Sequence, residues 1–98
     1  MAEKLKYVRG SSNIFADLGF GKAEAENLKM RSELMIRIVQ FYRNSGMTQA
    51  ATAKSLGLTQ PRLNALLKGK IGQFSLDALV NIASRAGLNV RLVVRKAA

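Results

Sequence analysis

The side chains best suited to bind another molecule lie between residues 47 and 70, in the stretch MTQAATAKSLGLTQPRLNALLKGK. Two Thr-Gln pairs begin at Thr48 and Thr59, on either side of Gly57. Amide, guanidinium and ammonium groups bind the edges of nucleic-acid bases and phosphate oxygens, and a small apolar side chain can contact a thymine methyl group. The second part of the stretch offers such groups at Gln60, Arg62, Asn64, Ala65 and Lys68.

Acidic side chains are absent from the same region. No Asp or Glu occurs from Leu34 through Leu76, whereas Glu24, Glu26 and Asp77 stand near other predicted helix starts, where the helix dipole favours negative charge. A solvated basic face would account for this absence equally well. Combined with the Thr-Gln pairs, it indicates that phosphates supply the negative charge. The basic residues in the window are Arg37, Arg43, Lys54, Arg62, Lys68 and Lys70.

Two short helices must position these side chains. Thr48 and Thr59 are typical N-cap residues, while Gly57 and Gly69 are typical of helix ends. A tight turn at Gly57, with the small Ala53 at the crossing, predicts a helix-turn-helix. Two capped helices of an unrelated bundle are the alternative. The leucines expected to fill the core beneath the pair are Leu56, Leu58, Leu63 and Leu66.

The rest of the chain predicts further helices. Residues 23–44 carry apolar side chains at helical spacing, and residues 75–86 begin with Ser75 as N-cap. Residues 1–22 predict an extended piece, a turn and one helical turn at 13–18. We expect an N-terminal extension at 1–22, a helix-turn-helix domain at 23–87 and a C-terminal strand at 88–98.

The C-terminal sequence LNVRLVVR, residues 88–95, alternates apolar and polar side chains and predicts a half-buried β-strand. A lone strand cannot satisfy its own backbone. We expect it to pair either with residues around 5–8 or with the same strand of a second subunit, in which case it contributes to dimerisation.

The amino-acid composition limits the classes of molecule that the protein is expected to bind. Sixteen Lys and Arg against six Asp and Glu give a net charge of +10, which favours a polyanion or an acidic protein. Cys and His are both absent, so we expect no disulfide, no metal site, no cofactor and no enzyme activity. The sequence has neither a membrane-spanning run nor a signal peptide, and we expect a cytoplasmic protein. Binding to a membrane surface is a weaker alternative, because no helix combines the basic residues with a large apolar face.

The stretch 47–70 resembles the Xre/Cro-type helix-turn-helix family of phage repressors and bacterial regulators. The resemblance implies an all-α, five-helix domain that binds duplex DNA, with a phosphate held by Gln49 and bases facing Gln60 and Arg62. One departure is Thr52, where the family usually places an aliphatic residue. The residues expected to contact DNA are Gln49, Thr59, Gln60, Arg62, Asn64, Ala65, Lys68 and Lys70.

The flanking segments SSNIFADLGF and LNVRLVVRK resemble the short antitoxin regulators encoded beside RelE/HigB-like toxins. This resemblance implies a homodimer that represses its own operator, an inverted repeat, and that also binds a toxin. Two alternatives are a free-standing phage-type repressor and a toxin-neutralising interaction protein in which the helix-turn-helix is only a scaffold.

Overall fold

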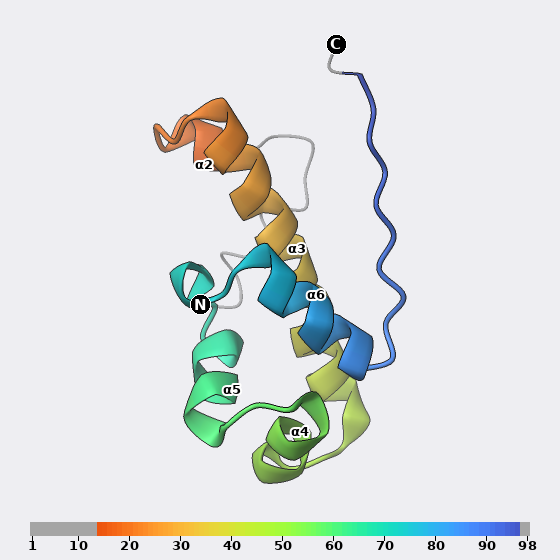
Figure 1. The fold of residues 1–98 in the computed structure, drawn as a ribbon. Coiled ribbons are helices and arrows are strands. Elements are labelled where there is room, and N and C mark those ends of the chain that lie inside the picture. Colours follow the sequence, from red (N-terminus) through yellow and green to blue (C-terminus); the bar gives the residue numbers. More distant parts are fainter. Residues whose placement is uncertain (1–13, 97–98) are drawn as a thin grey trace.

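The computed structural model describes residues 14–96, which form five α-helices and one 3-10 turn. The long helix α3 extends through the molecule, with α2 near its first residues and the pair α4–α5 at the opposite end (Figure 1). The predicted all-α architecture is confirmed. The elements are α2 (Ile14–Asp17), α3 (Lys22–Ser45), α4 (Gln49–Leu56), α5 (Gln60–Leu67), η1 (Ile71–Gln73) and α6 (Leu76–Arg85).

The three predicted N-caps are present. The hydroxyl oxygens of Thr48, Thr59 and Ser75 each accept a hydrogen bond from the backbone amide three residues further on, at 3.1, 3.2 and 3.1 Å. Gly57 ends α4 in the left-handed region at φ 71°, and a Cβ atom there would lie 3.0 Å from Nε of Arg85. The turn between α4 and α5 therefore favours glycine for its backbone conformation, and a larger residue would also have to displace this guanidinium slightly.

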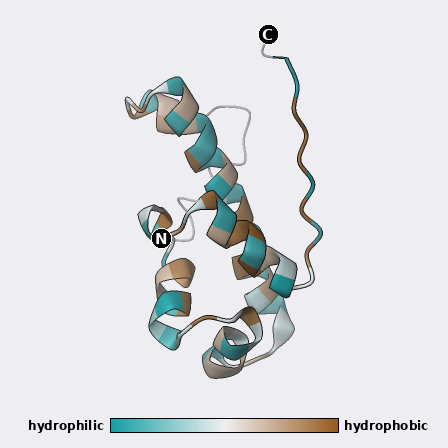
Figure 2. Ribbon diagram, in the orientation of Figure 1, coloured by the Kyte–Doolittle hydropathy of each residue, from teal (hydrophilic) through white to brown (hydrophobic). Residues whose placement is uncertain are grey.

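One hydrophobic core joins α3, α4, α5 and α6. Buried apolar side chains of all four helices form this core, and brown, hydrophobic segments are visible along α3 and α6 (Figure 2). The predicted crossing residue Ala53 and three of the four predicted core leucines are buried, while Leu58 is half-buried against the core. The members of this hydrophobic core with no more than 1% exposure are Met35, Ile38, Leu56, Leu63, Leu66, Phe74, Leu79 and Ala83.

Residues 88–96, here called the C-terminal arm, run as an extended segment (Figure 1) but form no strand within the described part of the chain. The amide of Leu88 donates to the carbonyl of Ala83 at 3.0 Å, and no backbone hydrogen bond joins 89–96 to another described residue. Leu92 and Val94 are each 83% exposed. The prediction of a half-buried strand is wrong for the described residues, because alternation favours a strand only where a second strand supplies hydrogen bonds. The predicted pairing with 5–8 falls outside the described residues.

Thr52 provides a test of the core. Its side chain is fully buried and its Oγ1 atom has no hydrogen-bond partner in the described structure. Replacing Thr52 by Val keeps the shape and removes an unpaired hydroxyl, so it should raise the free energy of unfolding by about 1 kcal/mol in urea denaturation. The control Thr52→Ser keeps the hydroxyl but loses a methyl group and should destabilise. A Thr52→Val protein less stable than the parent would contradict this reading.

Candidate nucleic-acid interface

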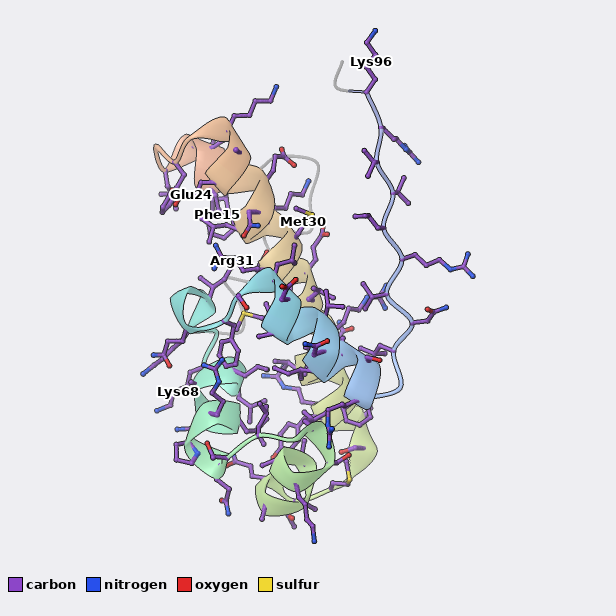
Figure 3. The ribbon with its side chains drawn as sticks, viewed as in Figure 1. Phe15, Glu24, Met30, Arg31, Lys68 and Lys96 are labelled. Atoms are coloured by element: carbon purple, nitrogen blue, oxygen red, sulfur yellow. The ribbon has the colours of Figure 1, made fainter. Side chains whose placement is uncertain are left out.

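Helix α5 presents a polar stripe to solvent. Gln60, Asn64 and Lys68 follow one another at four-residue spacing and are all exposed, whereas Leu63 and Leu66 on the opposite side are buried in the core. Lys68 extends from the outer side of α5, away from α3 (Figure 3). The core contact on one side of α5 therefore fixes which side chains the helix offers to a partner.

The other expected contact residues divide into two groups. Gln49, Thr59 and Lys70 are exposed, and they lie at the start of α4, at the start of α5 and before η1. Ala65, in contrast, is only 9% exposed and belongs to the core. The burial of Ala65 does not favour its predicted contact with DNA. The contacts of these residues with DNA stay predictions.

Arg62 has partners inside the chain. Its Nη1 atom donates to the carbonyl oxygen of Gln73 at 2.6 Å, and its Cζ atom lies 4.0 Å from the ring centroid of Phe74. The guanidinium is therefore directed toward the segment that follows α5, although its residue stands in the first turn of that helix. A contact between Arg62 and a base stays a prediction, and it would require the guanidinium to leave both partners.

A second arginine holds the same segment from the side of α3. Nη1 of Arg31 donates to the carbonyl oxygens of Phe74 and Ile71, at 3.1 and 3.4 Å. Figure 3 shows Arg31 on the side of α3 that faces this segment. Sequence reasoning missed Arg31, because its acceptors lie 40 and 43 residues further along the chain and no local pattern links them.

These contacts have an electrostatic consequence. The partners of both guanidinium groups in the described residues are carbonyl oxygens and an aromatic ring, which are neutral. The arginines therefore fix the segment 71–74 without losing their net charge to a carboxylate. Because no acidic residue occurs from 34 through 76, the end of the molecule that carries α4 and α5 keeps its positive charge.

The described residues contain no cluster of three or more acidic side chains that could hold a metal ion. A search of the same residues for a helix long and apolar enough to cross a membrane found none.

Comparison with known proteins supports the helix-turn-helix assignment. A family described as "Helix-turn-helix domain" matches residues 14–95. The chain belongs to this family. A solved structure described as "Putative XRE Family Transcriptional Regulator" is similar at a TM-score of 0.70 and 28% identity, covering 76% of this chain and 83% of that one. The resemblance to Xre-type proteins is thus confirmed at the level of fold. A search of curated proteins found no significant match.

In the free protein, the contacts of Arg62 with Gln73 and Phe74 should stabilise the fold. Arg62→Ala should lower the free energy of unfolding by about 1–2 kcal/mol, because it removes a cation–π contact and a charged hydrogen bond. In a double-mutant cycle with Phe74→Leu, the two losses should fall short of additivity by about 0.5–1 kcal/mol. Urea denaturation of the four proteins measures this coupling.

The control for that cycle replaces the exposed Arg37 by Ala, which should be additive with Phe74→Leu. Strict additivity for Arg62 as well would mean that the stacked geometry contributes nothing in solution.

Proposed function

We propose that the chain is a transcriptional regulator that binds duplex DNA in a sequence-specific manner. The observation that carries this proposal is the exposed polar stripe of Gln60, Asn64 and Lys68 along α5. The opposite side of this helix is buried in the core. The stripe lies in a region without acidic residues, in a protein of net charge +10. The fold similarity to a protein described as an XRE-family transcriptional regulator supports the same function.

The dimensions of α5 suit the major groove. Eight residues give a helix roughly 12 Å long, which compares with a major-groove width of roughly 12 Å. Its start is firmly defined, since the Thr59 hydroxyl caps it and Pro61 lies in the first turn, where a missing N–H group costs little. A helix with a fixed start and a buried back can hold Gln60 and Asn64 in one register against base edges.

We further propose that the regulator acts as a homodimer on an inverted repeat. A single α5 contacts only a few base pairs, and two copies related by a two-fold axis double both the contact surface and the sequence that is read. The C-terminal arm is the segment that we assign to dimerisation, since its apolar side chains at Leu92, Val93 and Val94 are 67–83% exposed.

Footprinting tests the dimer geometry. On an operator isolated by selection from random DNA, two protected half-sites should appear with centres about one helical turn, roughly 34 Å, apart. A matched DNA with one scrambled half-site should bind far more weakly. Protection of one half-site at saturating protein would contradict the two-fold arrangement.

Binding isotherms separate the residues that read bases from those that hold phosphates. Gln60→Ala should cost about 1–3 kcal/mol on the operator and much less on random DNA, because only a base contact is lost. Lys68→Ala should weaken both and lower the slope of log K against log salt by about one unit per contact, or two per dimer.

The matched control is Lys22→Ala, which removes the same charge at the first residue of α3, away from the α4–α5 pair (Figure 1). It should leave the operator preference unchanged and alter the salt slope less than Lys68→Ala. Equal losses on both DNAs for Gln60→Ala would remove the base-reading role from α5.

The most specific form of the proposal is that this regulator is the antitoxin and autorepressor of a toxin–antitoxin pair. The flanking sequences motivate it, and a partner of the RelE/HigB-like class would be encoded in the neighbouring reading frame. Co-purification of the two products, together with binding to the promoter of the pair, would support it. Toxin binding without operator binding would instead identify the helix-turn-helix as a scaffold.

A further inference from the structure

An apolar groove lies between the C-terminal arm and the helical body. Its volume is about 680 Å³, and its walls come from α3, from α6 and from the arm itself. Figure 3 shows Met30 on the side of α3 that faces the arm, and Met30 is 40% exposed. The apolar residues that line the groove include Met30, Leu34, Leu76, Val80, Val90 and Leu92.

Within the described residues, most of the arm has no backbone partner, and its apolar side chains are largely exposed. Residues 89–96 make no backbone hydrogen bond within the described chain, and Val90, Leu92 and Val94 are 40%, 83% and 83% exposed. Hydrophobic and hydrophilic segments alternate along it (Figure 2). An extended segment with unsatisfied amides and an apolar face is suited to pairing with another strand.

We infer that the arm pairs in antiparallel fashion with the arm of a second copy, and that Leu92 lies on the two-fold axis of the resulting two-stranded ribbon. The inference rests on the proposed homodimer and specifies its interface and register. The second copy is the favoured occupant because the arm's own sequence is complementary to itself in one register.

Symmetry restricts the possible registers. The two-fold axis runs perpendicular to the antiparallel ribbon, so each residue and its copy lie on the same face of it. Because directly opposed residues also share a face, one residue must lie opposite its own copy. The other pairs are then placed symmetrically about that residue. With Leu92 at the centre, Leu88 lies opposite Lys96 of the second copy and the whole arm, 88–96, is paired. Any other centre leaves part of the arm without a partner.

Charge favours the same register. With Leu92 at the centre, Arg91 lies opposite Val93 and Arg95 lies opposite Asn89, so no two cations face each other. A centre at Val93 would place Arg91 opposite Arg95 twice, and a centre at Arg91 would place that residue opposite its own copy. Like charges directly opposite each other destabilise a strand pair. In a chain of net charge +10, this repulsion weighs against both alternatives.

The register also gathers the apolar side chains on one face. Val90 lies opposite Val94 and Leu92 lies opposite Leu92, which forms an uninterrupted apolar row across both arms. The groove along α3 and α6 offers the surface on which this row can be buried. Pairing would thus cover the most exposed apolar side chains of the arm and satisfy its backbone in one step.

A cysteine scan tests the register directly, because the chain contains no cysteine. Single variants from Val90→Cys to Val94→Cys are oxidised with diamide in the full-length protein and separated on non-reducing gels. Leu92→Cys should give the most covalent dimer, since directly opposed residues have Cα atoms roughly 4.5–5.5 Å apart, within disulfide range. At positions 91 and 93, each residue is displaced by two residues along the ribbon from its own copy. The two Cα atoms then lie roughly 8 Å apart, beyond disulfide range.

The control for disulfide chemistry is the double variant Val90→Cys with Val94→Cys. In the inferred register these positions face each other, so the double variant should form covalent dimers although each single variant forms few. Maximal cross-linking at 91 or 93 would overturn the register. Equal, weak cross-linking at all positions would overturn the ribbon.

Sedimentation then separates this inference from the proposed function. Leu92→Arg should convert the dimer to a monomer with unchanged helical circular dichroism, because Leu92 is 83% exposed in the single chain. If Leu92→Arg remains a dimer and still binds operator, the ribbon is wrong and the DNA-binding proposal stands. If cross-linking peaks at Leu92 but no DNA is bound, the ribbon stands and the proposed function fails.

Discussion

The contact on which the rest of the structure depends is the burial of α3 against α5 and α6. Ile38, Leu66 and Leu79 come from these three helices, and all three are fully buried in one core. Their apolar surface is removed from water only when α5 lies with one defined side against α3. The orientation of α5, and with it the side that carries Gln60 and Asn64, is a consequence of this packing rather than of any property of α5 alone.

A second constraint acts on the segment after α5. Arg62 and Arg31 hold it from two sides through carbonyl oxygens and the ring of Phe74. Carboxylates would have made stronger partners, but they would also have placed negative charge beside the surface proposed to meet phosphates. Neutral acceptors hold the segment 71–74 in place and leave the electrostatic potential of the adjacent surface positive. The absence of acidic residues from 34 through 76 is therefore compatible both with the way this segment is held and with the proposed contact with phosphates.

The C-terminal arm has a sequence that favours a β-strand but lacks, within the described chain, a second strand to pair with. Its alternation has the period of a strand, and its backbone is extended, yet nothing in the described chain lies beside it to complete a ladder. Leu88 is held at the end of α6 by Ala83, so the arm begins from a fixed point and then leaves the body. A segment anchored at one end and uncovered along its length is suited to association between chains.

The sequence by itself determined where α4, α5 and α6 start, since each cap at Thr48, Thr59 and Ser75 is a hydrogen bond across three residues and needs no distant partner. It also determined the polar stripe of α5, because helical periodicity separates Gln60 and Asn64 from Leu63 and Leu66. Only the tertiary structure decided that Ala65 is buried, that Arg62 stacks on Phe74 and that Arg31 reaches a loop some 40 residues away. Contacts between residues far apart in the chain depend on how the helices pack, and no periodicity or spacing within a short stretch encodes that packing.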